Sequence, residues 1–528
     1  MERIRFRPLA LAVAIGAIAL LPLMGANAST NAAQVNKVGF ANTFPYVQVL
    51  PSLLPNSKEN TSVVAQNDGT AAATIVMDVY TPAGVLVPSA SVPFTNVPPG
   101  ATRTFAQAIN SGLTPGFRGV GVLSSDQPVN ALLVRDILGN SGGHSYSIHS
   151  ANAAGGTKVT LPFVANNFNG AYATRFTVAN TGTTTACISV QYAFVDGRPS
   201  VTESPTGQGG CTNGYAIPVN GQVAFAPTTV DGALPMPAST SGAMMAATVT
   251  ASSGTITVGV DSYYINGNRG LASYDGFVVG TSAADSDLGT TILIPIALKE
   301  DGYFSQILLS NPNSTAANAT IDYLDQNTGQ HYTVNLAVPA NGTANHSVYE
   351  TTGGIPEGFI GSATVTSDQP LAAVVFRVKM TSPGSYVYDD LYSAANGIPD
   401  GRATTTAKFP LIFRRAYSQM PTYVGYNTWV NVAVVGGGTA NLTITSINDT
   451  SNAAPGCQAA ATYTITKQIT GSFVFYQNAD SDNGFGQNPS CFWGGMVITS
   501  DKPIIAVSDA QNDLNTGDND GMYNAFGS

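Results

Sequence analysis

Short stretches of alternating apolar and polar residues recur along most of the chain. Phe176 and Val178 stand two positions apart in one such stretch, and Ile307 and Leu309 do so in another. A period of two is the spacing of a strand with one buried face, and no long stretch has the period of an amphipathic helix. Seven or eight such strands in roughly every 120 residues predict an all-β chain built of β-sandwiches.

The strand pattern occurs in four copies. Each copy opens with an apolar-Pro-apolar strand or a near match: Leu50-Pro51, Leu161-Pro162-Phe163, Ile294-Pro295-Ile296 and Phe409-Pro410-Leu411. A second strand follows, at Thr61–Asn67, Thr174–Asn180, Ser305–Asn311 and Thr428–Val434. A third strand comes soon after, at Ala73–Tyr80, Ala186–Tyr192, Ala319–Tyr323 and Ala440–Ile444. Because only a short turn separates the second strand from the third, the two are predicted to pair as a hairpin.

The clearest mark of the repeat lies late in the first, third and fourth copies, and it is degraded in the second, which has Ser252-Ser253-Gly254 in place of the turn. The mark has three parts, a pair of residues with an aromatic second member, a Ser-Asp-x-Pro segment and an apolar strand. In the first copy they are Gly116-Phe117, Ser125-Asp126-Gln127-Pro128 and Ala131–Val134, and in the third they are Gly358-Phe359, Ser367-Asp368-Gln369-Pro370 and Ala372–Val375. In the fourth copy they are Phe492-Trp493, Ser500-Asp501-Lys502-Pro503 and Ile505–Val507. Asp or Ser caps a turn, and Pro fixes φ, so the pattern predicts a hairpin, which is a strand, a tight turn and a strand. A binding motif is the alternative interpretation.

Each copy closes with a Tyr-bearing segment, which is predicted to be the final strand before a linker rich in small residues. These segments are Ser145–Ile148, Ser273–Phe277, Val387–Leu391 and Met522–Phe526. The resulting division is a signal peptide at 1–28 and four β-sandwich repeats at 29–154, 155–284, 285–399 and 400–528. With short linkers between the repeats, we expect an elongated mature chain.

These four units resemble the tandem immunoglobulin-like and fibronectin-type-III-like repeats of bacterial secreted or cell-surface proteins. The resemblance covers nearly all of the mature chain and rests on the strand spacing and the Gly-Phe and Ser-Asp-Gln-Pro signature. It implies Ig-like β-sandwich domains and an extracellular or cell-surface location.

The N-terminus has the features of a Sec-type signal peptide. Arg3, Arg5 and Arg7 precede an apolar run at Leu9–Leu23, which leads into the cleavage pattern Ala26-Asn27-Ala28. A membrane anchor is the alternative, but the run is short for a span of about 20 residues. No later stretch has 18 uninterrupted apolar residues, so no transmembrane segment is expected in the mature chain.

The composition and net charge of the chain exclude some classes of binding partner. Charged residues make up 10% of the chain, and its formal net charge is −10. The predicted signal contributes three Arg and one Glu, so its removal makes the chain more acidic still. An acidic chain without a basic stretch is a poor binder of nucleic acid and of anionic membranes.

The four cysteines fall into two local pairs, and in an exported protein they are predicted to form disulfides. The predicted bonds are Cys187–Cys211 and Cys457–Cys491. A zinc site is not expected, because there is no Cys-x-x-Cys pair.

Residues for catalysis are sparse. Gly139–Gly143 resembles the nucleophile segment of trypsin-like proteases, but no His precedes it to serve as the general base. The four histidines, His144, His149, His331 and His346, form no zinc-protease pattern. Paired carboxylates for glycoside hydrolysis remain open, with Glu300, Asp301, Asp389 and Asp390 as candidates. We expect the protein not to be an enzyme.

Acidic loops near the C-terminus offer oxygen ligands for calcium, the one cofactor for which the sequence has candidates. The candidate ligands are Asp480, Asp482, Asp513, Asn515, Asp518 and Asp520. They do not match the EF-hand pattern, and Asx-rich turns are the alternative explanation.

The leading hypothesis is a secreted or cell-surface structural or adhesive protein. Its expected partners are cell-surface or extracellular matrix components, among them glycans, or further copies of the chain itself. The alternative is a non-catalytic carbohydrate-binding or other ligand-binding extracellular protein, and a glycoside hydrolase or its accessory protein is third. The two tryptophans, Trp429 and Trp493, lie beside apolar strand patterns, so core packing explains them better than a sugar-binding platform.

Overall fold

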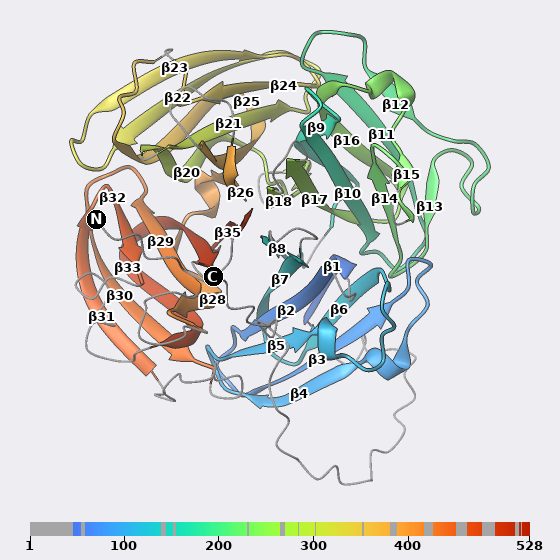
Figure 1. Ribbon diagram of the computed structural model, residues 1–528, viewed down its shortest axis with the longest axis horizontal. Helices are drawn as coiled ribbons and strands as arrows, with labels where there is room; N and C mark the ends of the chain where they lie inside the picture. Colours follow the sequence, from blue (N-terminus) through green and yellow to red (C-terminus); the bar gives the residue numbers. More distant parts are fainter. Residues whose placement is uncertain are drawn as a thin grey trace, which may run out of the picture.

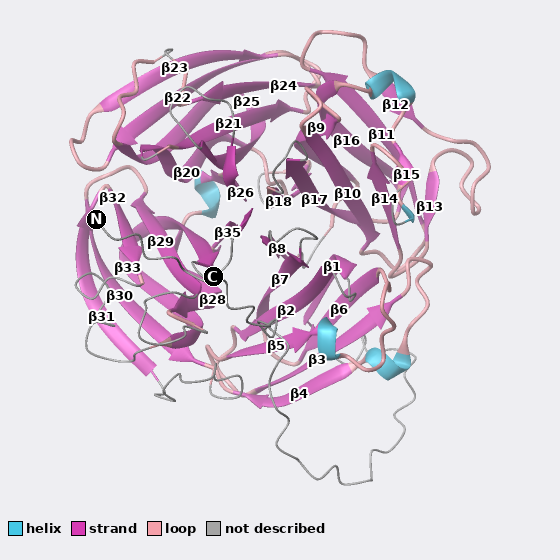
Figure 2. Ribbon diagram, in the orientation of Figure 1, coloured by secondary structure: helices cyan, strands magenta, loops and turns pink. Residues whose placement is uncertain are grey.

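The computed structural model is an all-β molecule, as the alternating pattern predicts. It describes residues 46–527 with gaps, and the residues outside the description are 1–45, 54–58, 139–143, 152–154, 230–231, 265–269, 283–284, 301, 351–352, 381–387, 417–425, 450–461, 478–490, 513–516, 519 and 528. Figure 2 shows strands throughout, with a few short 3₁₀ helices. The predicted signal peptide lies outside the described residues and stays a prediction.

Repeats 1 to 4 denote the described parts of the four predicted units. Repeat 1 contains β1 (Tyr46–Leu53), β2 (Glu59–Asn67), β3 (Ala73–Tyr80), η1 (Pro88–Ala90), β4 (Val92–Val97), β5 (Thr102–Ala106), η2 (Gln107–Ile109), β6 (Gly119–Ser125), β7 (Val129–Leu138) and β8 (His144–Ser150). Repeat 2 contains β9 (Lys158–Asn166), β10 (Tyr172–Asn180), β11 (Ala186–Phe194), β12 (Val201–Glu203), β13 (Tyr215–Ile217), β14 (Gln222–Ala226), β15 (Leu234–Pro235), η4 (Ala238–Thr240), β16 (Ala243–Ser253), β17 (Ile256–Tyr264), β18 (Leu271–Asp275) and β19 (Phe277–Val278).

The second half of the chain follows the same plan. Repeat 3 contains β20 (Gly289–Glu300), β21 (Tyr303–Asn311), β22 (Ala317–Asp325), β23 (His331–Val338), β24 (Gly342–Ser347), β25 (Phe359–Met380), β26 (Tyr388–Asn396) and β27 (Ile398–Pro399). Repeat 4 contains η5 (Asp400–Arg402), β28 (Thr404–Arg414), β29 (Tyr426–Val434), β30 (Thr439–Asn448), β31 (Thr462–Thr470), β32 (Ser472–Tyr476), β33 (Phe492–Asn512), β34 (Gly517–Asp518), β35 (Asp520–Asn524) and β36 (Phe526–Gly527).

Repeats 1 and 2 each have two sheets, one nearer the centre of the molecule and one nearer its rim. Repeats 3 and 4 each form one 8-stranded sheet, because the long strands β25 and β33 pair with one set of strands along their first half and with another along their second half. In repeat 1 the inner sheet has the order β8-β7-β2-β5 and the outer sheet the order β1-β6-β3-β4. Repeat 2 has β18-β17-β10-β14 inside and β9-β16-β11 outside. Buried apolar side chains from both sheets form the core, for example Val63 of β2 and Ile75 of β3. This arrangement is the predicted β-sandwich.

The predicted hairpin of second and third strands is wrong, because the two strands do not pair with each other. In repeats 1 and 2 they belong to different sheets, and in repeats 3 and 4 they are not neighbours within the single sheet. β2 pairs with β5 and β7, whereas β3 pairs with β4 and β6. Asn67, at the end of β2, is fully buried and donates hydrogen bonds to the carbonyls of Ala71 and Val97. Asn180 and Asn311 make the equivalent bonds in repeats 2 and 3. The buried amide thus stabilises a crossover between sheets, where a hairpin was expected.

The Ser-Asp-x-Pro segment is also a crossover, so its prediction as a hairpin is wrong. β6 lies in the outer sheet and β7 in the inner one, and in repeat 3 the single strand β25 pairs first with β20 and β22 and then with β21 and β26. Asp368 accepts hydrogen bonds from the backbone and side chain of Asn318, and Asp501 binds Asn441 in the same way. The motif therefore has a structural role, which accounts for its recurrence.

The Tyr-bearing segments are equivalent in repeats 2 and 4 only. The hydroxyls of Tyr274 and Tyr523 donate to the carbonyls of Phe163 and Leu411, next to the prolines of the opening strands. In repeat 1 the residue at this position of the inner sheet is Ile148, and in repeat 3 it is Ala394. The alignment through Tyr146 and Tyr388 is wrong because those residues precede the shared position.

The four repeats are arranged in a ring around a common centre (Figure 1). The strands β8, β18, β26 and β35, one from each repeat, gather at this centre, and we call them the axial strands. The contacts run from β8 to β18, β26, β35 and back to β8, and β18 also contacts β35. In addition, β34 of repeat 4 pairs in parallel with β8 of repeat 1. The first and last repeats are therefore joined, and the ring is closed.

Apolar contacts support every junction of the ring. One core cluster contains side chains of repeats 2 and 3, and a second contains side chains of repeats 1 and 4. Val120 and Ala179 connect repeats 1 and 2, and Leu293 and Ile505 connect repeats 3 and 4. The expected elongated chain is therefore wrong. Each repeat packs against both of its neighbours around the same axis.

Candidate functional site

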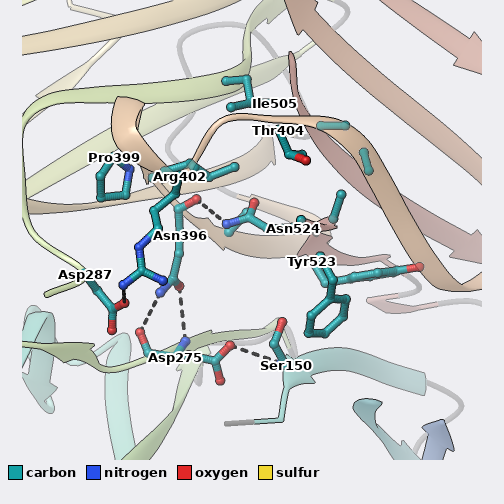
Figure 3. Close-up of a pocket in the computed structure, with 18 of the residues that line it drawn as sticks. Ser150, Asp275, Asp287, Asn396, Pro399, Arg402, Thr404, Ile505, Tyr523 and Asn524 are labelled. Atoms are coloured by element: carbon teal, nitrogen blue, oxygen red, sulfur yellow. Dashed lines mark hydrogen bonds and ion pairs between the residues drawn. The ribbon is translucent and has the colours of Figure 1, made fainter. Parts of the chain in front are cut away.

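The axial strands border a pocket where all four repeats meet. Its volume is about 810 Å³, within the range of small-molecule sites. Its lining includes Asn130 and Ser150 of repeat 1, Asp275 and Asp287 of repeat 2, Asn396 and Pro399 of repeat 3, and Arg402, Thr404 and Asn524 of repeat 4. Figure 3 shows the labelled side chains, among them Ser150, Asp275 and Asn396, converging from separate ribbons. No single repeat forms this site, because its wall needs all of them.

A chain of hydrogen bonds runs along the pocket lining from repeat 4 to repeat 1 (Figure 3). The Asn524 amide donates to the carbonyl of Asn396 at 2.6 Å, and the Asn396 amide donates to the carbonyl of Asp275 at 2.8 Å. The backbone N–H of Asp275 donates back to Asn396 Oδ1 at 3.2 Å. The backbone N–H of Ser150 then donates to Asp275 Oδ2 at 3.0 Å. These bonds fix the relative positions of four chain segments on one side of the pocket.

The carboxylate of Asp275 forms an ion pair with the imidazole of His149. His149 lies 3.3 Å from Asp275 Oδ1 and 3.0 Å from Asp261 Oδ1, and it is buried. Burial acts to lower the pKa of His149, but its hydrogen bonds to both carboxylates outweigh burial and raise the pKa to about 9. Arg135 forms an ion pair with Asp261 from the other side. At neutral pH the two carboxylates are therefore balanced by two cations.

Arg402 and Asp287 form a second balanced pair, at the more exposed part of the lining. An Arg402 guanidinium nitrogen lies 3.6 Å from Asp287 Oδ1 and donates to the carbonyl of Ser286 at 3.2 Å. Asp287 Oδ2 accepts the backbone N–H of Val278 at 2.9 Å. Burial raises the pKa of the Asp287 carboxyl, against the opposing effects of that hydrogen bond and Arg402.

Two polar atoms in the lining have unused hydrogen-bonding capacity. Among the described residues, nothing is hydrogen-bonded to Asn130 Nδ2 or to Asn524 Oδ1. Asn130 is only 8% exposed. A buried polar group without a partner costs about 1–3 kcal/mol, so a ligand that satisfies these two atoms would stabilise the site.

The disulfide prediction is confirmed for the first pair. Cys187 and Cys211 are bonded, with their Cα atoms 5.6 Å apart. Cys491 is also disulfide-bonded, but Cys457 lies outside the described residues, so the pairing Cys457–Cys491 stays a prediction. Both cysteines of the confirmed bond belong to repeat 2, away from the residues that line the axial pocket.

The calcium candidates are only partly visible. Asp480, Asp482, Asp513 and Asn515 lie outside the described residues. The carboxylate of Asp518 accepts the backbone N–H groups of Leu271 and Tyr392, and that of Asp520 accepts from Arg377 and from Ser393. Within the described part of the chain, no three acidic, His or Cys side chains are grouped for a metal. Asp518 and Asp520 instead connect repeat 4 to repeats 2 and 3.

Arg377, Asp509 and Asp520 form an ion cluster between repeats 3 and 4 that corresponds to Arg135 and Asp261 between repeats 1 and 2. Burial raises the pKa of Asp509. Burial also acts to raise the pKa of Asp520, but Arg377 and the hydrogen bonds outweigh it and lower the pKa. One position of the inner strands is therefore Arg in repeats 1 and 3 and Asp in repeats 2 and 4, and these residues are Arg135, Arg377, Asp261 and Asp509.

The other sequence candidates do not meet at one place. Asp301 and Gly139–Gly143 lie outside the described residues, and only the strand is described for Asp389 and Asp390. His331 Nδ1 lies 2.8 Å from Asp322 on an exposed strand, and His346 Nδ1 lies 2.7 Å from the hydroxyl of the buried Tyr323. Of the histidines whose side chains are described, only His149 lies beside the axial pocket.

Sequence reasoning missed Asp275, Asn396 and Asn524. In each of these repeats the last short strand pairs with the opening strand, through Phe277, Ile398 and Phe526 respectively. Asp275, Asn396 and Asn524 each lie two residues before that pairing residue. A recurring Asp or Asn just before the last short strand was the available signal. It was obscured in repeat 3 by the alignment through Tyr388, which placed the wrong residues opposite Asp275.

Comparison with known proteins assigns no family. No family model and no curated protein matches the chain. Among solved structures, Thermotoga maritima 1070 has a TM-score of 0.19 and 14% identity, over 21% of this chain and 94% of that one. The tetra-tandem repeat in the extending region of a large adhesion protein has a TM-score of 0.11 and 11% identity, over 91% and 98%. The B domain of a biofilm-associated protein has a TM-score of 0.14 and 9% identity, over 73% and 81%. TM-scores this low are no basis for assigning a function.

Proposed function

We propose that this chain is an extracellular, non-catalytic binding protein whose ligand site is the axial pocket. The observation that carries this proposal is that one cavity is lined by residues from all four repeats. Clefts between domains are preferred places for small-molecule sites. Closure of the ring brings the four repeats together around this pocket. A string of independent spacer domains would not form it.

Export supports the extracellular part of the proposal. The predicted signal peptide and the Cys187–Cys211 disulfide both fit an oxidising compartment. In the described part of the chain, no helix is long and apolar enough to cross a membrane. Attachment to a cell surface through glycans, matrix components or other copies of the chain remains the second candidate, favoured by the acidic, charge-poor composition.

The axial pocket fits a binding role better than a catalytic one because its carboxylates are already engaged in hydrogen bonds and ion pairs. Both oxygens of Asp275 accept hydrogen bonds from repeat 1, and Asp287 contacts Arg402 and a backbone N–H. A glycosidase needs one free carboxyl to donate a proton and a second to act as base or nucleophile. Hydrolysis of a bound glycan by the mature chain would therefore contradict the non-catalytic assignment.

The test is to block the pocket without disturbing the core. Thr405 lines the pocket and is exposed, so Thr405→Trp should fill space at little cost to folding. The matched control is Thr333→Trp, on the exposed face of β23. A panel of metabolites and oligosaccharides is screened by thermal shift against the full mature chain. We expect at least one compound to raise the Tm of the wild type and of the control but not of Thr405→Trp. If no compound does so, or if the blocked variant responds equally, the proposal is wrong.

A further inference from the structure

We propose that the axial pocket takes a neutral, hydroxyl-rich ligand, a saccharide unit. This inference rests on the proposed function above and names the chemical class of its ligand. It follows from three properties of the lining: its charge balance, its unused hydrogen-bonding atoms and its apolar surface.

The charges that line the pocket are already compensated. Asp287 forms an ion pair with Arg402, and Asp275 forms one with His149. His149 also pairs with Asp261, which forms a further ion pair with Arg135. No Lys is among the lining residues. An ionised ligand would have to leave water without meeting a free counter-charge, and that transfer is strongly unfavourable. A neutral polar ligand avoids this cost.

Among the buried side-chain atoms of the described lining residues, one donor and one acceptor have no hydrogen-bond partner. Asn130 Nδ2 can donate, and Asn524 Oδ1 can accept, and nothing in the described structure is bonded to either. A hydroxyl is the group that can both donate and accept. Several hydroxyls on one small ring would therefore match an amide donor from repeat 1 and an amide acceptor from repeat 4 better than a ligand with carbonyl groups alone.

The lining also offers apolar surface. Ile398, Pro399 and Phe526 are partly exposed there. Saccharides present C–H faces as well as hydroxyls, so a pocket with both polar and apolar walls suits them. A second cavity, of about 740 Å³ between repeats 3 and 4, is lined by Gly436, Gly437, Gly438, Asp322 and His331 among others. It belongs to two repeats only, and an exposed ion pair occupies its polar part.

The test is a glycan array followed by calorimetry with the free sugars that bind, using the full mature chain. The variant Asn130→Leu removes the buried donor at nearly constant volume, and Thr405→Trp blocks the pocket. The control Asn335→Leu changes an exposed Asn on β23. We expect the wild type and the control to bind a neutral saccharide, Asn130→Leu to bind it at least tenfold more weakly, and Thr405→Trp not to bind it. Thermal unfolding of each variant shows that it is folded.

The outcomes separate the two proposals. If a charged or apolar compound binds and Thr405→Trp abolishes its binding while no saccharide binds, the pocket is a binding site and the saccharide inference is wrong. If a saccharide binds all variants equally, it binds elsewhere, and the inference is again wrong. If nothing from the array or the metabolite panel binds, both the inference and the proposed function fail.

Discussion

Asp261 illustrates how single residues hold the ring together. Its carboxylate is buried between Arg135 and His149 of the neighbouring repeat and also accepts the hydroxyl of Ser273. Burial acts to raise the pKa of Asp261, but Arg135 and His149 outweigh it, and the net effect is a lowered pKa. The residue therefore stays ionised inside the protein, and its neighbours depend on that charge.

Replacing Asp261 with Asn should destabilise the protein by about 3–5 kcal/mol, because Arg135 loses its buried counter-ion. The matched control is Asp196→Asn, which breaks the ion pair with Arg198, where both side chains are about half exposed. Exposed pairs contribute little, so we expect almost no change there. Urea unfolding of both variants measures the difference, and equal midpoints would refute the role given to the buried pair.

His149 should make stability depend on pH. Its pKa is raised in the folded protein from 6.5 to about 9, so the stability it adds is fully present below pH 6.5 and is lost as pH rises to 9. The groups facing it are Asp261, Asp275 and, through Asp261, Arg135. We expect the wild type to lose on the order of 3 kcal/mol over this range, and His149→Asn to lose clearly less. Parallel stability curves for the two proteins would contradict this.

At the scale of elements, the buried Asn at the end of the second strand is the feature that joins the two sheets. Asn311→Ala removes hydrogen bonds to the carbonyls of Thr315 and Val338 and one from the backbone of Asn313. Carbonyls left without donors should cost roughly 2 kcal/mol or more. Asn335→Ala, on an exposed strand, should change stability by less than about 0.5 kcal/mol. Chemical denaturation of the two variants provides the comparison.

Strand positions could be predicted from the sequence, but strand pairing could not. A period of two in the sequence places β10 and β21 correctly, although both faces of each strand are buried over its second half. It does not report which strand lies alongside, and a short connection can join two sheets as readily as two neighbours. The information that distinguishes the cases is in Asn67 and its equivalents, whose amides reach carbonyls across the connection.

The sequence could mark the axial-site residues by their recurring Asp or Asn, but for a related reason it could not show that they meet. Asp275, Asn396 and Asn524 are about 120–130 positions apart in the chain, and nothing local indicates that they touch. Their proximity depends on the ring closing, which in turn depends on apolar surfaces between repeats such as Val120 against Ala179. In the sequence, apolar residues that pack between two repeats have the same alternating pattern as apolar residues that pack within one repeat, so the two kinds of contact cannot be distinguished.

The shared cores have a consequence for isolated repeats. The sequence predicts that residues 285–399 fold alone, and this stays a prediction. Because repeats 2 and 3 contribute to one apolar cluster, we expect the fragment 155–399 to unfold at a higher urea concentration than the fragment 285–399. Circular dichroism during unfolding measures both midpoints. A midpoint for the single repeat equal to or above that of the pair would show that the shared cluster adds no stability.

The central claim, that four repeats close into a ring, is tested most directly by small-angle X-ray scattering of the full mature chain. A compact arrangement of about 500 residues should have a radius of gyration of about 23–26 Å. Four units of about 14 Å each, joined end to end, should instead give about 40 Å. A value in the lower range is the result predicted here. A value near the upper one would mean that the repeats form a string, that the axial strands do not meet and that the pocket does not exist in solution.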